Sequence, residues 1–108
     1  MLNTNFKKME EKIKKKLPQI KKLFAKYGAI RVYLFGSAAT GKSNENSDVD
    51  FLYTFSEDLN YETYADNYFN LLHELQDLLK KKVDLVAEKT LKNPYLIESI
   101  NESKIQLI

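Results

Sequence analysis

The sequence predicts a small α/β fold with a sheet of at least three strands. Two observations support this prediction. Short runs of β-branched and aromatic residues alternate with segments whose apolar residues recur at helical spacing, and a long helical segment separates the second run from the third. Such a crossover makes the strands on either side parallel neighbours in one sheet. The chain has 108 residues, 44% of them hydrophobic, which is enough for one core but not for two.

The first helical segment contains a proline. Apolar side chains recur every three or four residues from Phe6 to Tyr27. Proline fits the first turn of a helix far better than its interior, so we predict a short helix ending near Lys16 and a second helix from Pro18 to Tyr27. Gly28 then ends the helix, because glycine readily adopts the left-handed conformation found after a helix C-terminus.

The strands and the connecting segments follow from local composition. Residues 30–35, 48–55 and 83–87 are rich in branched and aromatic side chains and are predicted strands. Residues 36–47 are small and polar, which indicates a loop. Apolar residues at helical spacing predict a helix over residues 61–81, and the lysines at its C-terminal end suit the helix dipole.

The C-terminal segment predicts one more helix and a short end piece. Asn93 is suited to cap a helix and Pro94 to occupy its first turn, so we expect a helix from there to about Asn101. Residues 105–108 are predicted either to add an edge strand or to pack as a tail. The sequence shows no internal repeat.

Positive charge is concentrated at the N-terminal end. Residues 1–27 contain nine lysines against two glutamates, a net charge of +7, which leaves −5 for residues 28–108. Such a segment is either a solvated helix face or a surface that attracts nucleic acid, a polyphosphate ligand or an acidic protein. A nucleic-acid binder that uses these lysines is therefore one alternative function.

Composition also excludes several classes of function. The absence of cysteine rules out disulfide scaffolds, thiolate metal sites and thiol nucleophiles. The sequence has no apolar run of the length that a signal peptide or a membrane span needs, so we expect no membrane association and a cytoplasmic location.

Three aspartates lie where a strand would not normally accept them. Asp48 and Asp50 alternate with apolar residues, so both are expected on one face of the second strand, and Asp84 is second in the third strand. Like charges this close repel unless a cation lies between them. Three oxygen ligands without cysteine favour Mg²⁺ or Mn²⁺ over zinc. The structural alternative is that Asp48 caps the loop and Asp84 is merely exposed.

The loop before these aspartates begins with Gly36 and Ser37, a pair suited to contact a triphosphate through backbone N–H groups and a hydroxyl. Residues 36–43 also match the Walker A pattern, which ends in Lys42 and Ser43. A P-loop requires a helix starting at that Lys-Ser pair, whereas here a strand follows within a few residues. We therefore do not predict a P-loop NTPase, although Lys42 remains a candidate phosphate contact.

The order strand, Gly36-Ser37, polar loop, Asp48-Val49-Asp50, helix and Asp84 resembles the polymerase β-like nucleotidyltransferase superfamily. The small size is most similar to the minimal nucleotidyltransferase (MNT) antitoxins of HEPN/MNT toxin-antitoxin systems. The resemblance implies a small α/β fold with a mixed sheet of three to four strands flanked by helices. It also implies a single minimal domain over 1–108, with a basic helical part at 1–27 and a catalytic core at 28–108.

The resemblance further implies an enzyme that transfers AMP from ATP to a hydroxyl, expected to be a tyrosine, of a cognate HEPN toxin, with which it would form a hetero-oligomer. Asp48, Asp50 and Asp84 match the catalytic, metal-binding carboxylates for two Mg²⁺ ions, with Mn²⁺ as an alternative. Gly36 and Ser37 match the triphosphate-binding turn. Nucleic acid is not expected to be a direct substrate.

One departure from the family pattern bears on activity. Many relatives carry an arginine directly after Gly-Ser, whereas this chain has Ala38, Ala39 and Thr40. Arginine would help to neutralise the triphosphate. Its absence leaves three alternatives: weaker nucleotide binding, compensation by Lys42 or by the basic N-terminal part, or a catalytically weak or inactive antitoxin that neutralises its toxin by binding alone.

Overall fold

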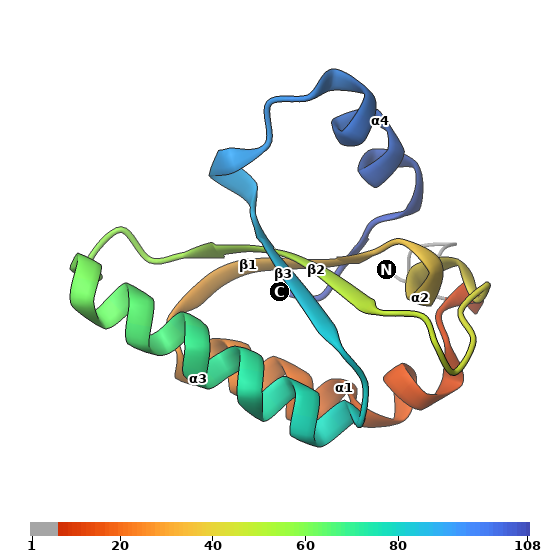
Figure 1. The fold of residues 1–108 in the computed structure, drawn as a ribbon, viewed down its shortest axis with the longest axis horizontal. Helices are drawn as coiled ribbons and strands as arrows, with labels where there is room; N and C mark the ends of the chain where they lie inside the picture. The colour runs from red at the N-terminus through yellow and green to blue at the C-terminus, as the bar shows by residue number, and fades with distance from the viewer. Residues whose placement is uncertain (1–6) are drawn as a thin grey trace.

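The computed structural model describes residues 7–108 and shows an α/β fold built on one four-stranded mixed sheet (Figure 1). The elements in chain order are α1 (Glu11–Lys26), β1 (Ala29–Phe35), α2 (Ser37–Thr40), β2 (Val49–Phe55), α3 (Tyr61–Leu79), β3 (Val83–Ala87), the 3₁₀-helix η2 (Glu88–Thr90), α4 (Pro94–Ser103) and β4 (Ile105–Gln106). None of the helices within residues 7–108 combines the length and apolarity needed to cross a membrane.

The sheet has the strand order β3-β2-β1-β4. β2 and β3 are parallel and are joined by α3, which confirms the predicted crossover, while β1 is antiparallel to both β2 and β4. β3 has the predicted bounds. Of the two alternatives for the C-terminal residues, the edge strand is confirmed, because Ile105 of β4 pairs with Leu34 of β1.

The two faces of the sheet differ in what covers them. In Figure 1, α1 and α3 lie on one side of the sheet and α4 lies on the other. On the first side, the core face, the rings of Phe24 in α1 and Phe51 in β2 meet edge to face with centroids 5.1 Å apart. Both rings are fully buried, and burying each contributes roughly 2–3 kcal/mol.

We call the opposite side of the sheet the open face. Strand alternation and register determine which side chains lie on it. Its side chains come from Tyr33, Phe35, Asp50, Leu52, Asp84 and Val86. α4 covers part of it, and both Leu52 and Ile100 are only 2% exposed. The predicted start of α4 is confirmed: the Asn93 side chain accepts hydrogen bonds from the backbone N–H groups of Tyr95 and Leu96, and Pro94 is the first helical residue.

The predicted break in the N-terminal helix is wrong. α1 runs without interruption from Glu11 to Lys26, with Pro18 in its interior. Leu17 and Ile20, on either side of the proline, are both buried against the sheet. Packing of this apolar stripe offsets the roughly 3 kcal/mol that an interior proline costs. Phe6, the first residue of the predicted stripe, lies outside the described residues.

Two boundaries between β1 and β2 also differ from the prediction. Residues 36–47 were expected to form a loop throughout, but Ser37–Thr40 form the single helical turn α2. Ala38 and Ala39 are fully buried, so two residues that favour helix are held there by packing. β2 begins at Val49, so Asp48 directly precedes the strand and is not part of it.

The interior proline leads to a stability prediction. Pro18→Ala restores a backbone N–H donor and removes the clash of the ring with the preceding turn, so it should raise the free energy of unfolding by about 1–3 kcal/mol in urea titrations. Gln19→Ala, at the exposed neighbouring position, is the control and should change it by less than about 0.5 kcal/mol. A Pro18→Ala protein no more stable than the wild type would contradict a continuous α1.

Candidate active site

Two of the three candidate carboxylates lie side by side on neighbouring strands. Asp50 of β2 and Asp84 of β3 occupy paired positions in the parallel ladder, so both project from the open face. Adjacent strands are about 4.8 Å apart, which places the two carboxylates within reach of a common ligand. Asp50 is half-buried and Asp84 is exposed.

The third carboxylate is close enough to act on the first. Burial, followed in size by the negative charges of Asp84 and Asp48, raises the pKa of the Asp50 carboxyl to about 6. All three aspartates, which we call the acidic cluster, therefore share one region of negative potential at the N-terminal ends of β2 and β3. Within this region a proton or a cation is favoured over three free carboxylates.

The three aspartate carboxylates are chemically suited to bind a hard divalent cation. Carboxylate oxygens are the ligands that Mg²⁺ and Mn²⁺ prefer, and a divalent ion would relieve the repulsion that raises the pKa of Asp50. Across residues 7–108, no group of three acidic or histidine side chains is already arranged to hold one ion together. Side-chain rotation would be needed to complete a ligand set around Asp50 and Asp84.

The glycine turn is pressed against the same carboxylates. Gly36 follows β1, whose last residue Phe35 pairs with Asp50. Its φ is +75°, and a Cβ atom there would lie 2.5 Å from Oδ2 of Asp50. Only glycine satisfies both the backbone conformation and this close approach. Ser37, the first residue of α2, is thereby placed next to the acidic cluster.

One side chain that contacts the turn is not predicted by any pattern in the sequence. The backbone N–H of Gly36 donates a hydrogen bond to Oγ of Ser103 at 3.2 Å. Ser103 is the last residue of α4, 67 positions away in sequence, and no local pattern marks it. The next residue, Lys104, places its Nζ 4.6 Å from the centroid of the Tyr33 ring. Residues 103 and 104 thus belong to the surroundings of the site.

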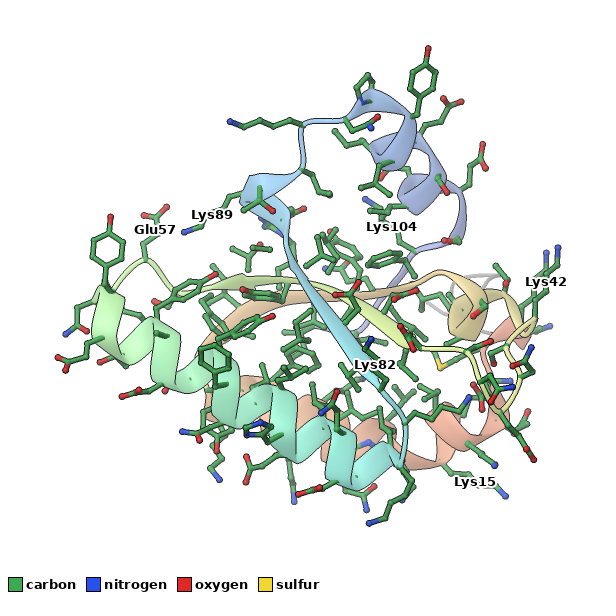
Figure 2. The ribbon with its side chains drawn as sticks, in the orientation of Figure 1. Lys15, Lys42, Glu57, Lys82, Lys89 and Lys104 are labelled. Atoms are coloured by element: carbon green, nitrogen blue, oxygen red, sulfur yellow. The ribbon has the colours of Figure 1, made fainter. Side chains whose placement is uncertain are left out.

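Lys42, the remaining predicted residue, is not brought to the aspartates. Its side chain is exposed and projects outward beyond α2, at the edge of the molecule (Figure 2). No helix starts at Lys42 and Ser43, as expected if the Walker A match is accidental. Instead, the Ser43 hydroxyl donates to Oε2 of Glu10 at 2.6 Å, and the Nζ of Lys81 donates to the carbonyl of Asn44 at 2.9 Å.

A cavity of about 1060 Å³ lies at the other ends of β2 and β3. Six of its fifteen lining residues are aromatic, among them Tyr53, Tyr64 and Tyr68, and we call it the aromatic cavity. The hydroxyls of Tyr53 and Tyr64 are 2.8 Å apart and hydrogen-bonded to each other. The only carboxylate in the lining is that of Glu57, so this cavity offers no acidic cluster for a divalent ion. We therefore place the candidate metal site at the end of the sheet where Asp50 and Asp84 lie, and not in this cavity.

The fold and the acidic cluster together define the nucleotidyltransferase class. A solved structure described as "Structure of putative minimal nucleotidyltransferase" is similar to this chain with a TM-score of 0.73 and 34% identity, over 90% of this chain and 95% of that one. A chain of a toxin-antitoxin complex with AMP-PNP gives a TM-score of 0.67 at 26% identity, over 85% of this chain and 72% of that one.

Sequence comparison agrees with the structural likeness. The family described as "Polymerase beta, Nucleotidyltransferase" matches residues 18–108. "Putative protein adenylyltransferase MJ1379" of Methanocaldococcus jannaschii is 39% identical over 94 residues, which cover 86% of this chain and 92% of the relative. A second protein of that organism, "Putative protein adenylyltransferase MJ0128", is 41% identical over 80 residues, covering 74% and 78%. The chain belongs to the polymerase beta nucleotidyltransferase family, which confirms the predicted enzyme class.

The raised pKa of Asp50 predicts a pH-dependent stability in the absence of metal. A carboxyl whose pKa is higher in the folded state than in the unfolded state binds its proton more tightly when folded, so stability falls as the pH rises from about 4 through 6. Asp50→Asn removes this penalty. At pH 8 in EDTA it should raise the free energy of unfolding by about 1–2 kcal/mol, less than the roughly 3 kcal/mol that two pKa units represent, because solvent screens the site.

The gain should disappear near pH 4, where Asp50 of the folded wild type is protonated. Urea titrations across this pH range provide the measurement. Asp66→Asn, at an exposed position of α3, is the control and should show no such trend. If Asp50→Asn is as stable as the wild type at pH 8, the three carboxylates do not share one potential.

Proposed function

We propose that this protein transfers AMP from ATP to a hydroxyl, expected to be a tyrosine, of a cognate HEPN toxin and thereby acts as its antitoxin. The observation that carries the proposal is the meeting of Asp50 and Asp84 at paired positions beside the Gly36 turn. The nucleotide and the acceptor are drawn from the family resemblance. They agree with the toxin-antitoxin complex with AMP-PNP, whose chain shares 26% identity with this one.

Each residue at the site has a distinct role in this proposal. Asp48, Asp50 and Asp84 would hold two Mg²⁺ ions, with Mn²⁺ as an alternative. When bound, such ions neutralise the triphosphate and make the acceptor hydroxyl easier to deprotonate. Gly36 and Ser37 would bind the triphosphate through the backbone and the hydroxyl. These assignments are supported by the position of the turn against Asp50.

The proposed reaction forms one phosphorus–oxygen bond and breaks another. The acceptor oxygen forms a bond to the α-phosphorus of ATP, the bond between that phosphorus and the oxygen bridging to the β-phosphate breaks, and pyrophosphate leaves. The acceptor hydroxyl proton passes to Asp84, whose carboxylate is exposed on the open face and accessible to a large acceptor.

The test is transfer of labelled AMP to the protein encoded by the neighbouring gene, in the presence of Mg²⁺. Asp48→Ala with Asp50→Ala should lower labelling at least about 100-fold, because the ion ligands are lost. Asp66→Ala with Asp77→Ala removes the same number of charges at exposed positions of α3 and is the matched control. Gel filtration of the mixed proteins should show that both double variants still form the complex.

The binding-only alternative gains from one observation. The positions where relatives carry arginine are occupied by buried alanines, so the turn itself supplies no cation. If the Asp48→Ala, Asp50→Ala protein protects cells from the toxin as well as the wild type does, protection is by binding alone and the transfer proposal is wrong. Loss of protection with an intact complex supports transfer.

A further inference from the structure

The turn that is proposed to bind the triphosphate has no positive side chain of its own. Ala38 and Ala39 are both fully buried under the turn, so no side chain of α2 can extend toward a triphosphate at those positions. A triphosphate placed here adds further negative charge beside Asp50 and Asp84, which already occupy paired positions on neighbouring strands. Beside the metal ions, a positive side chain from elsewhere in the chain would stabilise a triphosphate on the open face.

Several basic side chains around the sheet are already paired or point away. Arg31 holds the carboxylate of Glu88 through Nε and Nη2, both at 2.8 Å. Lys81 is paired with Glu10 at 3.5 Å. Lys42 projects outward. Lys82 and Lys104 form no ion pair within residues 7–108.

Lys104 is the better placed of the two. The preceding residue, Ser103, is hydrogen-bonded to the backbone N–H of Gly36, so the C-terminal end of α4 is attached to the proposed triphosphate-binding turn. Lys104 directly follows α4, and its side chain extends into the space between α4 and the sheet (Figure 2). Lys82, by contrast, is exposed and precedes β3 without any contact to the turn.

Register places the Lys104 ammonium on the same face as the carboxylates. Its Nζ lies over the ring of Tyr33 at 4.6 Å, and Tyr33 is opposite Leu52, two residues along β2 from Asp50. Two residues of a strand span about 7 Å, a distance that a flexible lysine stem can reorient across. The ring orients the ammonium without neutralising it, since an aromatic face carries no net charge. Burial raises the pKa of Glu88, which follows β3, but the hydrogen bonds with Thr54 and Arg31 and the charges of Arg31 and then Lys104 bring it below its usual value.

We propose that Lys104 is a nucleotide-binding residue whose ammonium moves from the Tyr33 ring to a phosphate of the bound triphosphate, replacing the cation that the Gly36-Ser37 turn lacks. This inference rests on the proposed function, because it takes a nucleoside triphosphate as the ligand of the open face. It assigns to α4 a direct part in substrate binding and makes the Ser103 hydrogen bond the anchor that keeps α4 over the turn.

Equilibrium binding of ATP and of adenosine, each with Mg²⁺, tests the inference by calorimetry on the full chain. Lys104→Gln should weaken ATP binding about 10-fold or more, the size expected for one charged contact, and should leave adenosine binding unchanged. Lys104→Arg keeps the charge and should bind ATP within about threefold of wild type. Lys89→Gln is the matched control: Lys89 also lies over a tyrosine, 5.0 Å from the Tyr64 ring, but it lines the aromatic cavity, and its loss should change neither affinity.

Three results would overturn the inference. Unchanged ATP affinity in Lys104→Gln is one, and a loss confined to Lys82→Gln would assign the contact to Lys82. An equal loss for ATP and adenosine would show a structural or base contact. Failure of the proposed function is distinguishable, because ATP that binds through Lys104 without any AMP transfer would refute the transfer and leave the binding role intact.

Discussion

The pairing of Asp50 with Asp84 is the constraint on which the rest of the site depends. Two carboxylates at matched positions of parallel strands repel, and the fold has no freedom to separate them, because a shift of the β2–β3 register would also move Phe51 and Leu85 out of the core. Burial makes the repulsion stronger for Asp50, whose pKa rises to about 6. The fold thus maintains a concentration of negative charge that a cation, not further packing, is suited to relieve.

The surrounding elements are arranged around that charge. Gly36 lies so close to Asp50 that no side chain would fit at the turn, and its backbone N–H is held by Ser103 at the end of α4. The core face, packed by α1 and α3, supplies the stability. The open face is covered in part by α4 (Figure 1), and Asp84 on this face is exposed. This division lets a small chain hold a repulsive cluster without weakening its core.

The sequence allowed prediction of features that depend on local chemistry. Strand β3 over Val83–Ala87, the Asn93 cap and the crossover that makes Asp50 and Asp84 neighbours all follow from alternation, capping and the handedness of connections. The break predicted at Pro18 is wrong because the cost of an interior proline is a local effect, whereas the packing that offsets this cost is tertiary. Ser103 could not have been found from spacing, since its contact with Gly36 exists only after α4 has folded over the sheet.

The most direct measurement follows the amide signals of the protein by NMR while Mn²⁺ is added below one equivalent. A paramagnetic ion at the carboxylates should broaden the amide signals of Gly36, Asp50 and Asp84 first and leave those of Glu62 and Asp66, exposed on α3, sharp. Asp84→Asn should reduce the broadening at Gly36 and Asp50. Broadening that begins at the exposed acidic residues of α3, or that is unaffected by Asp84→Asn, would contradict a metal site at the paired aspartates.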